Sequence, residues 1–331
     1  MEAIDGGRRD ALKWGLGVSV AAALAARGRP ARAADAKVVR IGYQKWGLLV
    51  LVKTKGLLEK AFAASDVKVE WAEFPAGPQL IEGISAGKLD LGVVGEGPPI
   101  FGQAAGAPLV YLAAEPPAPA AEAIVVAKDA AIDTVADLKG KRVVLNKGSN
   151  VHYFLIRALE DAKVAYDDVK ISFVPPAGAR AAFDSGKVDA WAIWDPFLAS
   201  VQKATGARIL RDAQGLAKNP GYYLGTRSFA DANPRLVKLF VDEVRKAGLY
   251  ANQHAGEVVD LLAPQLGIDK PALALALSRN PFGAGPITPE LVASQQHVAD
   301  TYYRLKLIPK AIRVADAQWA PPAGVVKAAQ R

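Results

Sequence analysis

A strand, a tight turn and a helix are predicted in succession by the stretch Lys141-Arg142-Val143-Val144-Leu145-Asn146-Lys147-Gly148-Ser149-Asn150-Val151-His152-Tyr153-Phe154-Leu155-Ile156-Arg157-Ala158-Leu159-Glu160. Residues 142–145 are mostly apolar and β-branched, as in a short buried strand. Residues 146–150 have turn chemistry, with Ser149 or Asn150 as the candidate N-cap of the helix that follows. The apolar residues after the turn recur at helical spacing.

The helix N-terminus predicted by this stretch offers unpaired backbone N–H groups and the positive end of a helix dipole. It can hold a small oxyanion without a metal ion. An ordinary capped turn between a strand and a helix is the simpler interpretation of these residues alone, because caps are commoner than anion sites. The rest of the chain favours the anion site.

The composition indicates a globular protein without thiol or metal chemistry. The 331 residues suggest two domain-sized units, and a chain with 51% hydrophobic and 22% charged residues can form an ordinary core. The absence of cysteine excludes disulfides, thiolate metal sites, a cysteine nucleophile and a lipid-modified cysteine anchor. The three histidines, His152, His254 and His297, lack the spacing of zinc ligands. We therefore expect no cofactor and no metal.

Residues 1–34 are predicted to be an export signal. A twin arginine, Arg8-Arg9, precedes an apolar run at 14–26 that is too short to span a bilayer, and Ala31-Arg32-Ala33 offers a cleavage site. The pattern resembles a twin-arginine signal, although Ala11 replaces the usual Phe; a Sec signal or a short membrane anchor are the alternatives. We expect a soluble, exported, periplasmic protein that does not insert into the membrane after processing.

The net charge of +8 overstates the charge of the mature protein. Residues 1–34 contain six Lys or Arg and three Asp or Glu, which leaves 35 basic and 30 acidic residues, a net charge of +5. The basic residues are scattered among acidic ones, so nucleic-acid binding is disfavoured. A mildly positive surface suits a small anionic ligand.

An internal repeat predicts two related lobes. Residues Gly87-Lys88-Leu89-Asp90 match Gly186-Lys187-Val188-Asp189 at an offset of 99 residues, and a carboxylate follows each aspartate by six residues, at Glu96 and Asp195. A helix entered through Pro-Ala-Gly precedes both segments. Each lobe then has the order strand, helix, strand, helix, strand, which predicts an α/β fold with mixed, mainly parallel sheets flanked by helices.

The elements expected from the patterns follow this order. Strands are expected at 38–42, 68–74, 89–94, 109–114, 124–128, 142–145, 170–174, 188–193 and 222–226. Helices are expected at 48–63 with a weakness at Gly56, and at 78–86, 100–105, 133–138, 150–162, 179–185, 234–250, 257–266 and 289–305.

Two stiff segments are expected to connect the lobes, near 115–121 and 218–223, which allows hinge closure. The first lobe then comprises 37–117 and 222–331, including the helical C-terminal third, and the second comprises 121–219. Ligands in such sheets sit outside the carboxyl ends of the strands. If the lobes face each other, one cleft is lined by the loops 43–47, 95–99, 147–150 and 194–197.

At these loops the sequence resembles the periplasmic solute-binding proteins of ABC importers for aliphatic sulfonates. The matching runs are Arg40-Ile41-Gly42-Tyr43-Gln44-Lys45, Phe74-Pro75-Ala76-Gly77-Pro78-Gln79-Leu80, Val93-Val94-Gly95-Glu96-Gly97-Pro98-Pro99-Ile100-Phe101, Glu115-Pro116-Pro117-Ala118-Pro119, Leu145-Asn146-Lys147-Gly148-Ser149-Asn150-Val151-His152-Tyr153 and Trp194-Asp195-Pro196-Phe197. The wider family includes binders of taurine, nitrate and pyrimidine precursors. One departure is Trp46-Gly47, where the resemblance leads us to expect a small polar pair.

The resemblance implies a two-lobed periplasmic binding protein of type II, with the ligand cleft between the lobes. Sulfonate oxygens are expected to meet backbone N–H groups near Ser149 and Asn150, with the Asn150 side chain helping. Gln44 and Gly97 are expected to approach from the first lobe. Two aromatic residues from different lobes, Trp194 and Tyr223, are expected to cover the organic tail.

The carboxylates of Glu96 and Asp195 repel a sulfonate, so we expect each to orient a donor or to bind a cationic part of the ligand. A cap or a hydrogen bond between the lobes is the alternative for both. Trp194 could instead pack beneath the sheet, on the face opposite to Trp191. His152 is interpreted as a packed or exposed helix residue. A sulfonate stays ionised at ordinary pH, so recognition by neutral donors is expected to be independent of pH.

The function expected from these observations is the capture of aliphatic sulfonates for sulfur acquisition. The protein would act as a monomer, without catalysis, and deliver its ligand to the membrane permease of an ABC importer. Binding of another small anion or organic sulfur or nitrogen source, such as nitrate or taurine, is one alternative. A pyrimidine-precursor synthase-like enzyme is another, but that branch of the family carries a cysteine-rich iron site and this chain has no cysteine. A sensor domain would require an attached output module.

Overall fold

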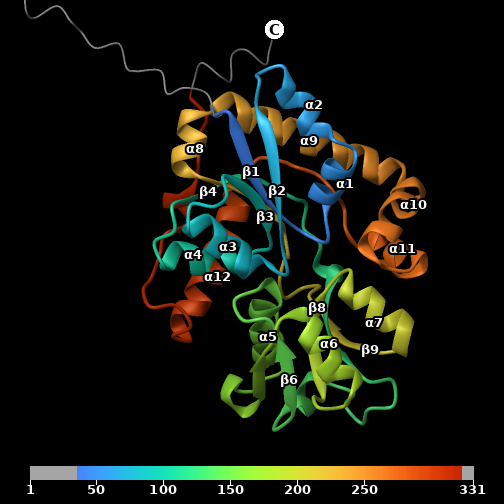
Figure 1. Cartoon of the computed structure of the whole chain (residues 1–331). Helices are drawn as coiled ribbons and strands as arrows, with labels where there is room; N and C mark the ends of the chain where they lie inside the picture. Colours follow the sequence, from blue (N-terminus) through green and yellow to red (C-terminus); the bar gives the residue numbers. More distant parts are fainter. Residues whose placement is uncertain (1–35, 323–331) are drawn as a thin grey trace, which may run out of the picture. The chain divides into compact units, whose positions relative to one another are not determined.

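The computed structural model of the protein describes residues 36–322, so the predicted export signal lies outside the described residues. The strands of this part form two five-stranded sheets (Figure 1). Among residues 36–322, no helix combines the length and the apolar character that crossing a membrane requires.

The first sheet has the strand order β2-β1-β3-β10-β4 and the second has β7-β6-β8-β5-β9. In each sheet four strands run in the same direction, and the fourth strand of the order runs antiparallel to both of its neighbours. These mixed sheets confirm the predicted fold class. The strands are β1 (Val38–Gln44), β2 (Lys68–Phe74), β3 (Leu91–Val94), β4 (Leu109–Ala114), β5 (Glu122–Val126), β6 (Arg142–Leu145), β7 (Lys170–Phe173), β8 (Ala190–Trp194), β9 (Arg208–Asp212) and β10 (Tyr222–Thr226).

Helices cover both faces of each sheet (Figure 1). The α-helices are α1 (Leu48–Thr54), α2 (Leu57–Ala63), α3 (Gly77–Ser85), α4 (Gly97–Ala104), α5 (Asn150–Asp161), α6 (Pro176–Asp184), α7 (Phe197–Thr205), α8 (Arg227–Ala232), α9 (Pro234–Gln253), α10 (Ala255–Leu266), α11 (Lys270–Arg279) and α12 (Pro289–Arg304). Short 3-10 turns are η1 (Pro119–Ala121), η2 (Val135–Leu138), η3 (Tyr166–Asp168) and η4 (Val314–Ala317).

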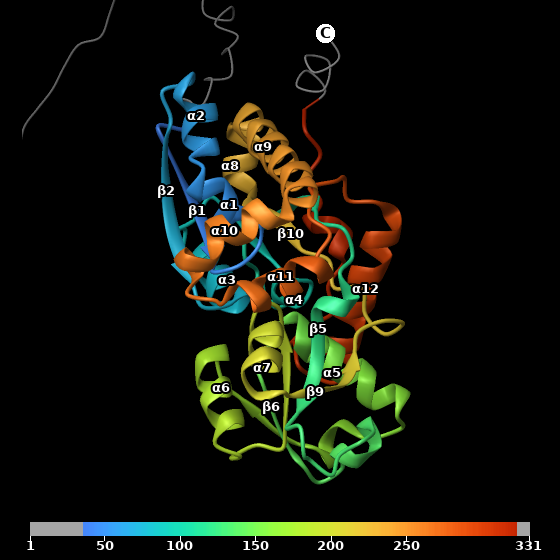
Figure 2. The same ribbon diagram turned by 90° about the vertical axis from the view of Figure 1, so that its right-hand side faces the viewer.

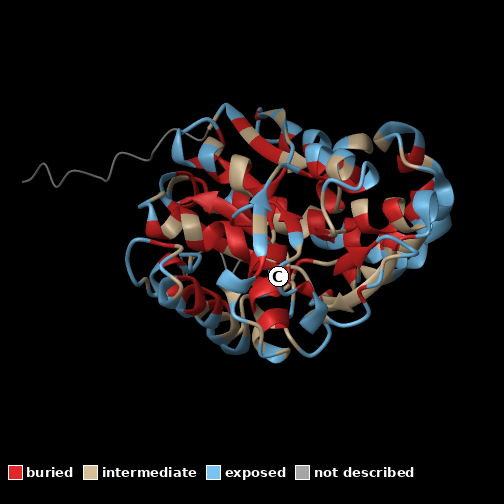
Figure 3. Ribbon diagram, turned by 90° about the horizontal axis from the view of Figure 1, so that it is seen from below, coloured by how far each residue is buried: buried red, intermediate tan, exposed pale blue. Residues whose placement is uncertain are grey.

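The alternation of strand residues decides which helices cover which face. In β10, Tyr222 and Leu224 pack with α3, α4 and α12, whereas Tyr223 packs with α1, α2, α9 and α10. In the second sheet, α5 covers one face, and α6 and α7 cover the other around Trp191. Figure 3 shows the buried residues concentrated along the strands and the inner sides of the helices. Side chains that alternate along a strand therefore fill different cores on the two faces of each sheet, and one of these cores extends over both sheets.

The internal repeat has a structural counterpart at the start of each sheet. The Arg40 guanidinium donates to Asp90 (Nη2 to Oδ1, 2.9 Å) and to the Gly87 carbonyl (3.0 Å). Arg142 donates in the same way to Asp189 (2.8 Å) and to the Gly186 carbonyl (3.1 Å). The repeated Gly-Lys-x-Asp segment thus ties the first strand of each unit to the strand beside it.

Several elements begin elsewhere than the sequence pattern predicts, and some are additional. The helix expected at 100–105 begins at Gly97, because Pro98 and Pro99 fit the first turn, where a missing N–H costs nothing. The elements that the sequence did not predict are β9, α7, α8 and α11. Of these, β9 is an edge strand with charged ends, and α11 is an Ala- and Leu-rich helix with little polar contrast between its faces. Such segments carry a weak periodic signal.

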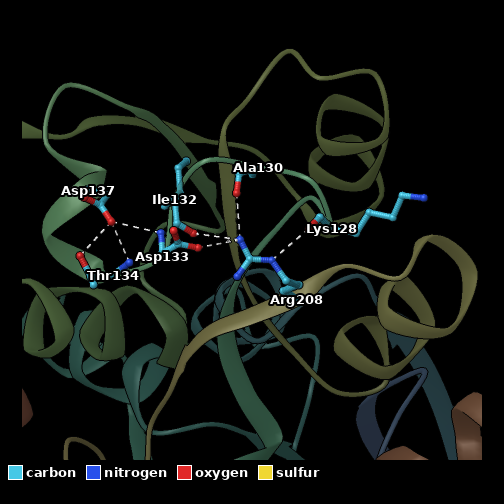
Figure 4. A network of polar contacts seen from close by, with 7 residues as sticks. All are labelled: Lys128, Ala130, Ile132, Asp133, Thr134, Asp137 and Arg208. Carbon is cyan, nitrogen blue, oxygen red and sulfur yellow. Dashed lines mark hydrogen bonds and ion pairs between the residues drawn. The ribbon is translucent and has the colours of Figure 1, made fainter.

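The edge strand β9 is fixed by Arg208 (Figure 4). Its guanidinium donates to the carbonyls of Lys128 (3.1 Å), Ala130 (2.9 Å) and Ile132 (3.2 Å). The adjacent 3-10 turn is closed by a capping box between Thr134 and Asp137. These contacts hold the connection between β5 and β6 against the edge of the second sheet.

The C-terminal third contacts both halves of the molecule, whereas the sequence led us to assign it to the first lobe. Helix α11 packs on α7, and α12 packs on both α4 and α5 (Figure 2). The Tyr302 hydroxyl donates to the Ser149 carbonyl at 3.1 Å, and Arg304 forms an ion pair with Glu160. These helices therefore bridge the two sheets. The predicted lobe boundaries and hinge crossings stay predictions.

Candidate ligand-binding cleft

A cavity of about 90 Å³ lies where the carboxyl ends of the two sets of parallel strands meet. All four loops that the sequence placed at one cleft contribute to it. The residues that the sequence predicted and that line the cavity are Gln44, Ser149, Asn150, Trp194 and Asp195. Lining residues that it did not single out as site residues include Trp46, Glu115, Asn219 and Phe282. The cavity is therefore built from both sheets, as expected for a cleft between two related units.

The turn before α5 opens the N-terminus of this helix toward the cavity. Gly148 has φ +74°, a conformation that glycine adopts without strain, and Ser149 at the N-cap position is extended (φ −80°, ψ 173°). The Ser149 hydroxyl does not cap the helix but donates to the Asn146 carbonyl at 2.7 Å. The His152 N–H donates to the Ser149 carbonyl at 3.1 Å, whereas the N–H groups of Asn150 and Val151, at the first two positions, have no carbonyl partner within the helix. A ligand oxyanion can accept from these two N–H groups, and the contact with a sulfonate stays a prediction.

His152 holds this turn in place without lining the cavity. Its side chain is fully buried, Nδ1 accepts from the Gly148 N–H at 3.2 Å, and Nε2 lies 2.8 Å from the Tyr166 hydroxyl. Burial, together with the charge of Lys147, lowers the pKa of His152 to about 3. The ring is therefore neutral at physiological pH, and the interpretation of His152 as a packed helix residue agrees with its position.

The Asn150 side chain has hydrogen-bond partners within the protein. Its Nδ2 donates to Glu122 Oε2 at 2.6 Å and to Asn219 Oδ1 at 3.0 Å. In turn, Asn219 Nδ2 donates to the Ala118 carbonyl at 2.9 Å. The side chain therefore ties the helix N-terminus to the predicted crossing segments, and the expected contact of the Asn150 amide with a sulfonate stays a prediction.

Glu96 does not line the cavity but lies in a buried carboxyl pair with Glu122. Burial raises the pKa of Glu96 to about 8, and burial together with the charge of Glu96 raises the pKa of Glu122 well above its ordinary value. Each carboxyl has one oxygen, Oε1, without a hydrogen-bond partner among residues 36–322. Two buried carboxyls in reach of each other cannot both ionise cheaply, so at least one stays protonated at neutral pH.

The raised pKa of Glu96 predicts a loss of stability as pH rises. A carboxyl with a higher pKa in the folded than in the unfolded chain stabilises fully below about pH 4.5, and for Glu96 this contribution is lost as pH rises through about 8. Between pH 6.5 and 9.5 we expect the unfolding free energy of the wild type to fall more than that of Glu96→Gln, by on the order of 2 kcal/mol in urea titrations. Below pH 6.5 the neutral His152 acts in the opposite direction, so the range starts there.

The control for this measurement is Glu82→Gln, which changes an exposed glutamate on α3 and should keep the wild-type slope. Equal slopes for the wild type and Glu96→Gln would show that Glu96 is already ionised in the folded protein.

Asp195 lines the cavity, but its carboxylate has structural partners. Oδ1 accepts from the Ala199 N–H at 3.0 Å, in the first turn of α7, and lies 3.4 Å from Nη1 of Arg279 on α11. Burial raises its pKa to about 6, against the opposing effect of Arg279. The interpretation of Asp195 as a cap and as a link between parts of the chain fits this geometry. Trp194 is half-buried at the cavity, whereas Trp191 is fully buried with α6 and α7.

Two further predicted residues, Gly97 and Tyr223, do not line the cavity. Tyr223 is fully buried among α1 and α9, and its hydroxyl donates to Glu115 Oε1 at 2.6 Å, so Tyr223 contacts a cavity residue without lining the cavity itself. At Gly97 a Cβ atom would lie 2.5 Å from the Ser149 carbonyl oxygen. Gly97 therefore allows the N-terminus of α4 to touch the turn before α5. Gln44 lines the cavity, and its Nε2 donates to the Val93 carbonyl at 3.2 Å.

Glu115 lines the cavity and has a raised pKa, but the sequence analysis did not identify it as a site residue. Burial raises its pKa to about 7, and the Tyr223 hydroxyl opposes the shift. The proline-rich run that begins with Glu115-Pro116-Pro117 was visible in the sequence, but it indicated only a segment that connects the two lobes. Glu115 and Asp195 both border the cavity and have pKa values near neutral pH, so the charge around the cavity changes in this pH range. The expectation of pH-independent recognition considered only the neutral donors and stays a prediction.

Comparisons with known proteins agree with this geometry. The model of the NMT1-like family matches residues 32–261. A protein of Escherichia coli (strain K12) that is named for the binding of aliphatic sulfonates is 42% identical over 287 residues, covering 86% of this chain and 89% of that protein. The alkanesulfonate-binding protein SsuA from Xanthomonas axonopodis pv. citri, solved with bound MOPS, is 39% identical with a TM-score of 0.83, covering 87% of this chain and 99% of that one.

An enzyme also shares the fold. The desulfurization enzyme DszB superposes with a TM-score of 0.63 at 18% identity, covering 89% of this chain and 99% of that one. Similarity at this level of identity is a similarity of fold alone.

Proposed function

The chain belongs to the NMT1-like family, and we propose that it is an extracytoplasmic binding protein that captures aliphatic sulfonates and delivers them to the membrane permease of an ABC importer. The relatives that share about two fifths of its residues over most of the chain are named for sulfonate binding. The ligand would be held in the cavity between the two sheets, and the protein would serve the acquisition of sulfur.

The observation that carries the proposal is the open N-terminus of α5 at the cavity. A sulfonate is a permanently charged headgroup with three oxygens, and the first-turn N–H groups and helix dipole of α5 suit such an anion. Other residues that line the cavity are aromatic, including Trp46, Trp194 and Phe282. A site that combines hydrogen-bond donors with aromatic walls fits a charged head joined to a hydrocarbon tail.

We infer that the protein binds its ligand without converting it. A catalytic hydroxyl would need a base such as histidine beside it. Ser149 lines the cavity and lies three residues before His152, but its Oγ donates to the Asn146 carbonyl. His152 accepts from the Gly148 N–H and is fully buried, so it is not positioned to activate that hydroxyl. A nucleophile and its base have to lie within hydrogen-bond reach, and these two side chains have other partners.

The same proposal covers location and partners. The periplasmic relative from Escherichia coli, the aliphatic sulphonate binding protein SsuA, superposes with a TM-score of 0.80 and supports an exported, periplasmic protein. We propose that it acts as a monomer with hinge crossings near 115–121 and 218–223, closing on its ligand and opening at the permease. Taurine and nitrate are the competing ligands.

Titration calorimetry tests the sulfonate proposal directly. Linear alkanesulfonates from ethanesulfonate to octanesulfonate, together with MOPS, should give saturable binding at one site, because all share the headgroup that the α5 N-terminus would hold. Taurine, nitrate and a pyrimidine precursor serve as competitors in the same series. Saturable binding of nitrate or the pyrimidine, with none of any alkanesulfonate, would contradict the proposal.

A further inference from the structure

Three cavities meet at the ring of Phe282. The cavity described above shares Trp46, Gly47 and Phe282 with a small pocket of about 10 Å³. The walls of that pocket are apolar, with Leu48 and Leu51 of α1, Leu262 and Leu266 of α10, and Leu277 of α11. A wider groove of about 400 Å³ also includes Phe282 and is lined by Val259, Leu277 and Pro281, among others. Trp46, Gly47 and Phe282 thus line both the polar cavity and the small apolar pocket.

The wall between them is an aromatic pair. The rings of Trp46 and Phe282 lie with centroids 6.0 Å apart and planes inclined by 56°. Trp46 occupies a short loop, and its N–H donates to the Gln44 carbonyl at 2.6 Å. The wall therefore joins the end of β1 to the loop after α11, two segments that are far apart in the sequence.

Phe282 is held firmly by α9. The Phe282 N–H donates to Asn252 Oδ1 at 3.0 Å, and Asn252 Nδ2 donates back to the Phe282 carbonyl at 2.8 Å. A Cβ atom at Gly248 would lie 2.9 Å from the Gly283 Cα, so the loop and the helix pack backbone to backbone. Further along the loop, Arg245 Nε donates to the Ala284 carbonyl at 3.1 Å. These contacts fix the backbone that carries the Phe282 ring, so the loop cannot move away from a longer ligand without breaking them.

The cavity is small, so the position of this wall can decide how long a ligand tail fits. A cavity of about 90 Å³ is well below the roughly 300 Å³ at which small-molecule pockets begin, so a headgroup and a short tail fill it. The polar wall, with Ser149, Asn150 and Asn219, suits the headgroup. A hydrocarbon tail gains free energy only where it meets apolar surface, and the apolar surface continues behind Trp46 and Phe282.

We propose that Trp46 and Phe282 set the tail length of the bound sulfonate by closing the cavity against an apolar subsite between α1, α10 and α11. The subsite takes the tail of a longer alkanesulfonate once either ring is removed. This inference rests on the proposed function. The family resemblance led us to expect a small polar pair where Trp46 and Gly47 stand, and the inference explains what the larger Trp46 side chain does there: it limits the length of the tail.

The test is the chain-length profile of affinity for the wild type, Trp46→Ala and Phe282→Leu, with linear alkanesulfonates of one to ten carbons in calorimetry. Affinity of the wild type should rise about fourfold for each methylene and then level off at the wall. In Trp46→Ala the rise should continue for about two or three more carbons, a gain of about 15- to 60-fold for the long ligands. Phe282→Leu should show a smaller extension in the same direction.

Trp71→Ala is the matched control. Trp71 and Trp46 are both half-buried against the same hydrophobic core, but Trp71 lies on β2 and lines none of the three cavities. Its profile should equal that of the wild type, and thermal unfolding should show that all variants fold. If the wild type binds the series and Trp46→Ala has the same profile, the inference is overturned while the proposed function stands. If the wild type binds no alkanesulfonate, the proposed function itself fails.

Discussion

Replacing Asn150 by proline is expected to weaken alkanesulfonate binding by about 100-fold while leaving α5 in place. Proline is favoured at the first position of a helix, and the preceding Ser149 already has the extended backbone (φ −80°, ψ 173°) that a following proline requires. The substitution removes one backbone N–H at the open end of the helix. A hydrogen bond to a charged group contributes about 1.5–3 kcal/mol, which corresponds to a loss of roughly 10- to 150-fold.

The matched control for this variant is Asn150→Ala, which keeps the backbone N–H. Both variants lose the side-chain amide that donates to Glu122 and Asn219, so both leave these groups without that partner. We expect Asn150→Ala to bind about tenfold more weakly than the wild type, and Asn150→Pro to bind at least tenfold more weakly than Asn150→Ala. Calorimetry with butanesulfonate measures the difference, and circular dichroism checks the fold. Equal affinities of the two variants would mean that the N–H at position 150 does not hold the headgroup.

A methyl group at Gly97 is expected to weaken ligand binding by about 10- to 100-fold. The added Cβ would lie 2.5 Å from the Ser149 carbonyl oxygen and 2.8 Å from that of Gly148, and both are backbone atoms that cannot move aside as a flexible side chain does. Overpacking of this kind costs about 1–3 kcal/mol or more. Because the contact joins α4 to the turn before α5, the clash is relieved by separating the two sides of the cleft, which disrupts the site.

Gly256→Ala on α10 is the control for Gly97→Ala, because a Cβ atom there meets no heavy atom within 4 Å. Its affinity for butanesulfonate should match that of the wild type. Small-angle scattering of Gly97→Ala with saturating ligand should report a more open molecule than the liganded wild type. Wild-type affinity in Gly97→Ala would show that the close approach at Gly97 is not needed for binding.

The sequence best predicted the elements that have a strong periodic pattern and clear start or stop residues. Strand β4 and strand β10 have the predicted bounds, and the weakness expected at Gly56 separates α1 from α2. The repeated Gly-Lys-x-Asp segments predicted two related units, and the equivalent ion pairs of Arg40 and Arg142 explain why those residues recur. Local patterns of this kind depend on neighbours in the sequence, so they can be read without the fold.

Contacts between distant segments could not be predicted in the same way. The positions of Asn252 and Phe282 contain no local signal that they bond to each other, and Glu96 and Glu122 come together only because two sheets face each other. Tyr223 illustrates the same limit. The family resemblance suggested a ligand contact for this residue, but the alternation of side chains in the sheet turns it into the core.

The sequence by itself determined the fold class, the family resemblance and the helix N-terminus at 149–150, because propensity, turn chemistry and repetition are local properties. The tertiary structure alone decided which groups share the cavity and which are used up elsewhere. It joins the Asn150 amide to Glu122 and Asn219, and it brings the rings of Trp46 and Phe282 together at the cavity. The physical reason is that hydrogen bonding and packing depend on which residues meet in space. Folding brings together residues that are far apart in the sequence, such as Asn150 and Glu122, 28 positions apart, and Trp46 and Phe282, 236 positions apart.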